Sequence, residues 1–329
     1  MDATQPSSSI KTRFLIISDT HGMQFSSENR PRQRADVAIH CGDLTEESKL
    51  AEYRDSIELL TEIDAPLKLV IAGNHDWTMD IPVFKKKVTE VRPPVDPALV
   101  KVTYGDYGEA RQIFEQVKNK GIILLDEGEH TFILQNGALL TVYASPWTPQ
   151  MGEWGFQYPP NQGHNFEIMK NVDVAITHGP PKGIMDYTND RQRAGSSELF
   201  AVIARARPRL HCFGHIHEGW GAKMVTWRNQ PTKTPSHFTD IDNDKSTVIE
   251  KLSGFTPSTF DTPEIKLEKG KRLKYYRQER CCSTSHCSGD YSPLESGKQT
   301  LFVNASIEGT EEQPMQLPWL IDLELLPAN

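Results

Sequence analysis

The sequence lacks several features that would define its class at once. It has no apolar run close to the roughly 20 residues that a membrane span needs, and residues 1–10 lack the apolar core of a signal peptide. It also lacks an excess of positive charge, since its formal net charge is −8, which argues against nucleic acid as a partner. It has only five cysteines, an odd number that does not fit a disulfide framework. We therefore expect a cytoplasmic protein without a membrane segment.

The length of 329 residues allows one large domain or two small ones, and 22 prolines and 22 glycines indicate many loops. Residues 1–12 are polar, and we expect them to form a flexible tail before a single domain at 13–329. Within this domain, residues 226–299 are rich in Thr, Ser, Lys, Asp and Pro and poor in apolar periodicity. We expect this segment to be a polar, flexible insertion.

The alternation of apolar runs and helical patterns predicts an α/β fold. Short runs rich in β-branched residues predict buried strands at 14–18, 37–41, 67–72, 172–177 and 209–213. Helical patterns over 48–63 and 107–120 lie between them. Strands that alternate with helices favour largely parallel sheets.

The middle and the end of the chain predict further strands. The hairpin signal Asn136-Gly137 predicts that consecutive strands are added antiparallel to a second sheet, at 121–125, 130–135 and 138–144. The last strands are expected at 300–306 and 317–325.

Polar side chains follow the predicted strands where each strand ends, which is the edge at which parallel sheets collect ligands. These residues are Asp19, His21, Asp43, Asn74, His75, His178, His215 and His217. Carboxylate, amide and imidazole donors suit divalent metals of intermediate hardness, which favours Mn, Fe or Zn and allows Mg. There are enough donors for two ions. Asp43 is the best candidate to bridge them, because a carboxylate has two oxygens and this strand end has ligands on both sides.

The order of the motifs resembles the calcineurin-like metallophosphoesterases. The resemblance is carried by Asp19-Thr-His21, Gly42-Asp43, Gly73-Asn-His-Asp76, Thr177-His-Gly-Pro-Pro181 and Gly214-His-Ile-His217. Ser145-Pro-Trp147 and Phe302-Val-Asn-Ala-Ser306 are also similar to the metallophosphoesterase-domain-containing group, which includes class III cyclic nucleotide phosphodiesterases. The resemblance implies a four-layer sandwich of two mixed β-sheets flanked by α-helices.

The resemblance also implies the roles of the polar residues. One metal ion would be held by Asp19, His21 and His217, and the other by Asn74, His178 and His215. Asp43 would bridge the two ions. His75 would stabilise the phosphoryl group and protonate the leaving oxygen, so His75 and Asp43 are the implied catalytic residues.

One departure from the superfamily narrows the activity. Ser/Thr protein phosphatases follow their Gly-Asp with Val-Asp-Arg-Gly, whereas Leu44-Thr-Glu-Glu47 follows here. This difference disfavours a protein phosphatase, and it leaves open what orients His75, for which Asp76 is the adjacent candidate. We expect a phosphodiesterase for small phosphodiesters such as cyclic nucleotides, acting by in-line attack of a metal-bridging hydroxide. The alternatives are a phosphomonoesterase or a hydrolase of a specialised metabolite with the same metals, and a metal-bearing scaffold that recruits a protein through residues 226–299.

Residues that could contact a small phosphoester substrate are less well defined. The aromatic candidates are Trp147, Trp154, Phe156 and Trp220. They could form an apolar wall for a nucleobase, and the first three could instead pack as a satellite core. Arg191 or Arg193 could pair with a substrate phosphate or begin a solvated helix. A further cluster consists of Cys281, Cys282, His286 and Cys287. It lacks the paired spacing of ligands in a structural zinc site, and we expect its thiols to be exposed.

Overall fold

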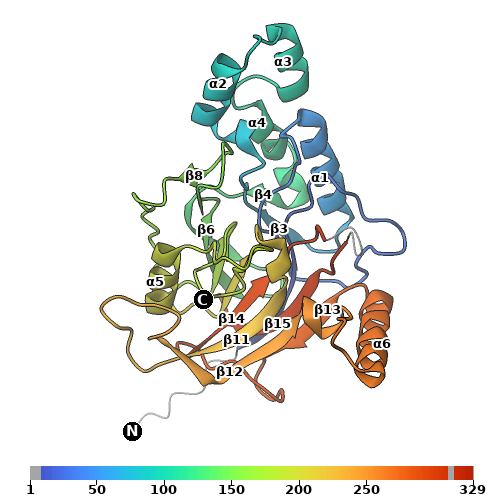
Figure 1. The fold of residues 1–329 in the computed structure, drawn as a ribbon, viewed down its shortest axis with the longest axis vertical. Helices are drawn as coiled ribbons and strands as arrows, with labels where there is room; N and C mark the ends of the chain where they lie inside the picture. Colours follow the sequence, from blue (N-terminus) through green and yellow to red (C-terminus); the bar gives the residue numbers. More distant parts are fainter. Residues whose placement is uncertain (1–8, 310–314, 329) are drawn as a thin grey trace.

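The computed structural model describes residues 9–309 and 315–328 and centres on two stacked β-sheets (Figure 1). The first sheet has the strand order β13 (Cys282–Ser285), β15 (Trp319–Leu325), β1 (Ile10–Ile17), β2 (Val37–His40), β3 (Leu67–Val70) and β4 (Ile122–Leu124). The second has the order β12 (Ile241–Lys251), β11 (Gly221–Trp227), β14 (Gln299–Asn304), β10 (Leu210–Phe213), β9 (Val174–Thr177), β6 (Leu139–Ser145) and β5 (Gly128–Ile133). Both sheets contain parallel and antiparallel pairs. A short additional pair is formed by β7 (Thr148–Pro149) and β8 (Gln157–Tyr158).

Three apolar clusters hold the layers together. The largest lies between the sheets and joins residues such as Ile16 of β1 to Val142 of β6. The outer face of the first sheet packs against α1 (Leu50–Glu62) and α4 (Glu109–Glu115). The outer face of the second sheet packs against α5 (Ser197–Ala206). The predicted four-layer α/β sandwich of two mixed sheets is confirmed.

The parallel strands place their carboxyl ends at one edge of each sheet. In the first sheet, Ile17 of β1 pairs with His40 of β2, and His40 pairs with Val70 of β3. In the second sheet, Cys212 of β10 pairs with Ile176 of β9. The loops that leave these strands therefore start close together.

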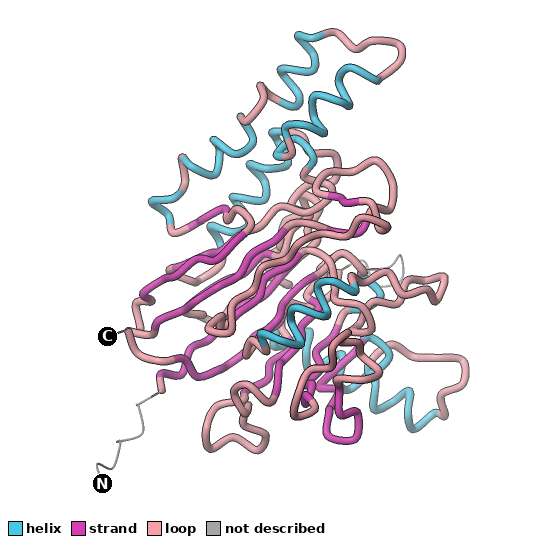
Figure 2. Tube along the Cα trace, turned by 90° about the vertical axis from the view of Figure 1, so that its left-hand side faces the viewer, coloured by secondary structure: helices cyan, strands magenta, loops and turns pink. Residues whose placement is uncertain are grey.

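Two short helices project from one end of the molecule (Figures 1 and 2). They are α2 (Ile81–Glu90) and α3 (Pro97–Tyr104), and they follow the 3₁₀ turn η1 (Trp77–Met79). Each begins with a capping aspartate and an early proline: Asp80 accepts from Val83 N, and Asp96 from Ala98 N. The sequence analysis did not predict them.

The segment 226–299 contains more regular structure than predicted. β12 pairs antiparallel with β11, β13 pairs parallel with β15, and α6 (Pro263–Glu279) lies between them in the chain. Most β12 side chains are not buried, and none of the described side chains of α6 is fully buried. Because these elements bury little, they show no apolar periodicity, which is why no strand or helix was predicted within 226–299. The flexibility of the segment stays a prediction.

Two further expectations need correction. Residues 1–8 of the predicted tail lie outside the described residues, but Ile10 already pairs with Leu325 of β15, so the tail prediction is wrong from Ile10 to Thr12. β4 was expected in the second sheet, but it pairs parallel with β3 in the first. The hairpin of β5 and β6 is antiparallel in the second sheet, as predicted. Among the described helices, none is long and apolar enough to cross a bilayer.

Candidate metal centre

The seven predicted metal ligands lie on loops at the shared edge of the two sheets. The first sheet contributes Asp19 and His21 after β1, Asp43 after β2 and Asn74 after β3. The second sheet contributes His178 after β9, and His215 and His217 after β10. The site therefore forms only when the two sheets are stacked.

The ligand atoms form two adjoining clusters. Those of Asp19, His21 and His217 lie within 4.8 Å of one another, and so do those of Asp43, His178 and His215. Asn74 Oδ1 lies 2.9 Å from His178 Nε2, which adds it to the second cluster. The structure thus brings all seven residues together in the two groups that the resemblance implies.

Asp43 lies between the clusters. Its Oδ2 is 3.9 Å from His21 Nε2 and 3.2 Å from His178 Nε2. Its Oδ1 accepts a hydrogen bond of 2.8 Å from the backbone N–H of His75. A carboxylate in this position can face two ions at once.

Several ligands have a strained backbone. The φ angles of Asp19, His21, Asp43 and His215 are 52°, 45°, 52° and 67°. The left-handed conformation costs a residue with a Cβ atom about 1–2 kcal/mol, and such strain gathers at functional sites. Here the strain turns side chains of four different loop positions towards one centre.

The donor set fits divalent cations. His215 Nε2 is buried and has no hydrogen-bond partner among the described residues. Leaving a buried polar atom unpaired costs about 1–3 kcal/mol, a cost that a bound cation would remove. Mixed carboxylate, amide and imidazole donors suit ions such as Mn²⁺, Fe²⁺ or Zn²⁺.

The charges of the site also favour a cation. Burial opposes the charged form of His21, but the contact with Glu46 and the charge of Asp43 outweigh it and raise the pKa of His21 to about 10. Burial is likewise outweighed by Asp43 at His178, whose pKa rises to about 9. At His215, burial lowers the pKa to about 3. The negative charge that raises these two pKa values would equally attract a metal ion.

Two buried histidines that the sequence analysis did not single out support the ligand loops. His40 Nε2 lies 2.9 Å from Thr20 Oγ1, beside Asp19 in the chain. His211 Nε2 lies 2.8 Å from Thr177 Oγ1, beside the ligand that follows β9. Each sheet thus has one buried histidine in a strand that holds a neighbouring loop. These two residues could have been found in the sequence, because each is a histidine inside an otherwise apolar run.

His75 is oriented by backbone and aromatic contacts. Its Nδ1 lies 2.8 Å from the carbonyl oxygen of Glu46. Its ring stacks on Trp154, with ring centroids 4.1 Å apart. A ring nitrogen of His75 also lies within 4.8 Å of ligand atoms of His21 and Asp43. His75 therefore lies beside the two clusters of ligand atoms, as expected.

Asp76 has a different role from the one proposed. It accepts hydrogen bonds from the backbone N–H groups of Leu44, Thr45 and Gly73 at 3.1, 3.1 and 2.8 Å. Burial raises its pKa to about 6. Asp76 ties the loop after β2 to the loop after β3, and the orientation of His75, which the sequence left open with Asp76 as a candidate, comes from Glu46 and Trp154 instead.

Two carboxylates at the rim were missed. Glu46 Oε2 lies 3.0 Å from His21 Nδ1. Glu308 Oε2 lies 3.1 Å from His21 Nε2 and 3.5 Å from His217 Nδ1. Glu308 follows β14, so the rule that ligands gather at strand ends could have found it.

Trp220 does not line a substrate wall. Its side chain is 1% exposed, its Nε1–H donates to the carbonyl of Leu317 at 2.9 Å, and its ring stacks on Trp319 at 5.0 Å. Trp220 immediately precedes β11 and packs between the sheets. The prediction of a substrate contact at Trp220 is wrong because proximity in sequence to His217 does not bring the side chain to the site.

Trp147 packs mainly against protein. Its ring lies 5.9 Å from that of Phe156 and stacks on His164 at 5.1 Å. This is the satellite packing considered as the alternative to a nucleobase wall. A substrate contact of Trp147 stays a prediction.

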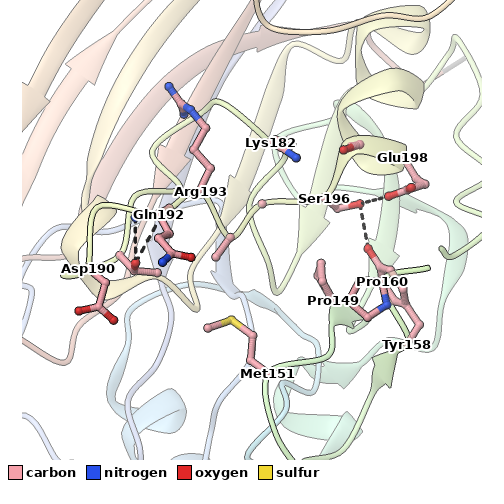
Figure 3. A pocket seen from close by; sticks show the side chains of 14 residues that line it. Pro149, Met151, Tyr158, Pro160, Lys182, Asp190, Gln192, Arg193, Ser196 and Glu198 are labelled. Carbon is pink, nitrogen blue, oxygen red and sulfur yellow. Dashed lines mark hydrogen bonds between the residues drawn. The ribbon is translucent and has the colours of Figure 1, made fainter. Parts of the chain in front are cut away.

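Arg193 lines a cavity of about 480 Å³ next to α5, whose other lining residues include Tyr158, Lys182 and Ser196 (Figure 3). Its guanidinium is engaged by Asp186 at 2.5 Å and lies 4.1 Å from the ring centroid of Tyr187. Substrate binding by Arg193 therefore competes with an existing ion pair, and it stays a prediction.

The cysteines are free and buried. Cys41 and Cys212 lie in the core between the sheets, as expected. Cys281, Cys282 and Cys287 are buried as well, so the prediction of exposed thiols is wrong. The short strand β13 and its ends turn these side chains into the protein.

Comparisons with known proteins identify the family of the chain. Residues 12–219 match the family model for calcineurin-like phosphoesterases. The chain is 36% identical over 242 residues to metallophosphoesterase domain-containing protein 1 of Homo sapiens. The match covers 68% of this chain and 69% of that protein. It is 33% identical over 220 residues to UPF0046 protein T07D4.2 of Caenorhabditis elegans, covering 64% and 52% of the two chains. The solved structure of TT1561 of Thermus thermophilus matches with a TM-score of 0.40 and 16% identity, over 65% of this chain and 84% of that chain. The family model and the human relative show that the chain belongs to the calcineurin-like phosphoesterase family and is a metal-dependent phosphoester hydrolase.

Proposed function

We propose that the protein is a phosphodiesterase for small phosphodiesters such as cyclic nucleotides, with two divalent ions drawn from Mn, Fe or Zn. The residues that would hold the ions are Asp19, His21 and His217 for the first, Asn74, His178 and His215 for the second, and Asp43 for both. When bound, such ions lower the pKa of a water molecule and neutralise charge on the phosphoryl oxygens.

The preference for diesters rests on the rim carboxylates Glu46 and Glu308, which contact His21 at 3.0 and 3.1 Å. Together with Asp19 and Asp43 they carry four negative charges, which would balance two divalent ions. A phosphomonoester brings nearly two negative charges at neutral pH, whereas a diester brings one. The rim carboxylates therefore repel the monoester more strongly.

His75 can supply the proton that the reaction needs. Hydrolysis adds the oxygen of water to phosphorus and breaks a P–O ester bond, and the departing alkoxide must be protonated. The carbonyl of Glu46 accepts from Nδ1–H of His75, so the transferable proton is a second one, which Nε2 carries when the imidazole is in its protonated form. The stacked ring of Trp154 limits rotation of the imidazole.

The test is a comparison of matched phosphodiesters and phosphomonoesters with the metal-loaded protein. We expect a higher kcat/KM for diesters, and Glu308→Gln is expected to reduce this preference about fivefold, the effect of one charge at close range in a solvated site. Glu295→Gln, which changes an exposed carboxylate paired with Lys298, is the matched control. A preference for monoesters in the unmodified protein would instead support the phosphomonoesterase.

A further inference from the structure

A second cavity, of about 390 Å³, lies where α2 and α3 project from the fold. Its apolar and aromatic lining consists of Trp77, Val88, Val91, Val95, Val100 and Tyr104. Its charged residues are Lys87, Glu90 and Glu153. The volume falls within the range of small-molecule sites, which are mostly apolar with a few polar groups. We call this cavity the α2–α3 pocket.

The α2–α3 pocket adjoins the catalytic histidine through one aromatic side chain. Glu153 lines the pocket, and the next residue, Trp154, stacks on His75 with ring centroids 4.1 Å apart. Lys87 Nζ lies 5.5 Å from the ring of Trp154 and 5.4 Å from that of Trp77. Trp77 itself follows His75 by two positions and is fixed by α2, since its ring lies 5.5 Å from that of Phe84. The pocket and the metal centre are therefore linked through the neighbouring residues Glu153 and Trp154.

The pocket leaves apolar surface in water that a ligand could cover. Val91 and Val95 are 39% and 40% exposed, although they face other apolar lining residues across the cavity. Exposed aliphatic groups that line a cavity indicate a binding site rather than a filled core. Six of the nine lining residues are apolar or aromatic, so a hydrocarbon group can cover more of the lining than a polar group can.

We propose that the α2–α3 pocket binds an apolar ester group, an alkyl chain or an aryl ring, of the phosphodiester whose phosphorus lies at the metal centre. This inference rests on the proposed phosphodiesterase activity, and it narrows the substrate class from cyclic nucleotides, whose two ester bonds share one sugar, to acyclic diesters with one apolar ester group. In this arrangement the hydrocarbon passes Trp154, which stacks on His75, and enters the pocket at Trp77, and the valines of α2, α3 and their connection enclose its end. The polar ester group on the other side of phosphorus stays outside the pocket.

The kinetic test uses diesters of glycerol and a primary alcohol, from methanol to octanol, with the full-length, metal-loaded protein. KM is expected to fall about threefold for each added methylene until the pocket is full, as burial of hydrocarbon predicts. Val95→Asp places a charge in the lining and is expected to flatten this dependence. Val102→Asp is the matched control, because Val102 lies on α3, is 79% exposed and does not line the pocket, so it should leave the dependence intact.

A binding test separates this inference from the activity. Methyl(octyl)phosphinate, which has two P–C bonds and no ester bond to hydrolyse, should bind at least tenfold more tightly than dimethylphosphinate, as followed by tryptophan fluorescence, and Val95→Asp should abolish the difference. Equal KM values for the methyl and octyl diesters, or equal binding of the two phosphinates, would overturn the pocket assignment. Failure to hydrolyse any diester, with chain-dependent phosphinate binding retained, would count against the proposed function and not against the pocket.

Discussion

At the scale of single residues, Asp43 carries the most weight because it faces both ligand clusters. Its Oδ2 lies near His21 and His178, and its Oδ1 holds the backbone of His75. Asp43→Asn removes the charge and one of the two oxygens that can face an ion. Mutations of residues behind metal ligands already cost about 10–100-fold, so we expect this change to reduce diester turnover by at least about 100-fold.

The measurement pairs turnover with metal content after gel filtration. Asp43→Asn should retain less than the full complement of metal while its far-ultraviolet circular dichroism is unchanged. Asp55→Asn, an exposed change on α1, should retain both metal and activity. Full turnover of the Asp43 variant would refute the assignment of this residue.

The residues of the metal centre were predictable because they combine a fixed chemical type with a fixed place after a strand. Glu308 followed the same rule and was missed because it lies outside the family motifs. The contacts of His75 were not predictable, since one is the carbonyl of Glu46, which is independent of the side chain, and the other is Trp154, which is distant in sequence. Trp220 shows the converse, since a residue three positions from His217 is a core residue.

At the scale of elements, buried strands were easier to predict than elements that bury little. β2, β9 and β10 are buried throughout, β3 is buried except at Leu67, and all four lie within the predicted runs. Of its described residues, α6 packs only Leu273 and Tyr276, both partly buried, against the core between the sheets, so its sequence shows no broad apolar stripe. Glu250 of β12, which is 5% exposed, accepts from Tyr276 Oη at 3.1 Å and from Arg272 Nη1 at 3.3 Å.

This attachment makes a prediction for α6. Glu250→Ala removes both acceptor contacts, and hydrogen exchange of the α6 amides should accelerate about tenfold, the equivalent of one or two lost hydrogen bonds. Exchange in β1 and diester turnover should stay the same, because α6 does not contribute to the metal centre. Lys271→Ala, which breaks only the exposed pair with Glu268, is the control. Exchange mass spectrometry with no change in α6 would show that other contacts hold the helix.

At the scale of the whole molecule, the metal centre depends on the stacking of two sheets, because each contributes ligands from its own strand ends. The large core cluster between the sheets sets their distance, and it contains residues from β1, β2 and β3 as well as from β6, β9 and β10. His40 and His211 occupy similar places in the two sheets, each bonded to a threonine beside a ligand. Stability of the sandwich and geometry of the site are therefore linked.

This link predicts how acid affects the fold. Burial lowers the pKa of His211 to about 3, whereas an unfolded histidine titrates near about 6.5. Above pH 6.5 neither state is protonated and the full stability is present. Below pH 6.5 this histidine binds a proton in the unfolded chain but not in the folded protein, so the free energy of unfolding decreases as the pH falls, by about 2 kcal/mol at pH 5.

His211→Gln keeps a hydrogen-bonding group near Thr177 but cannot titrate. In urea unfolding of the metal-free protein, its loss of free energy between pH 7 and pH 5 should therefore be about 2 kcal/mol smaller than that of the unmodified protein. His130→Gln on β5 is the control. An equal loss of unfolding free energy in the unmodified protein and in His211→Gln would mean that His211 is protonated in the folded state.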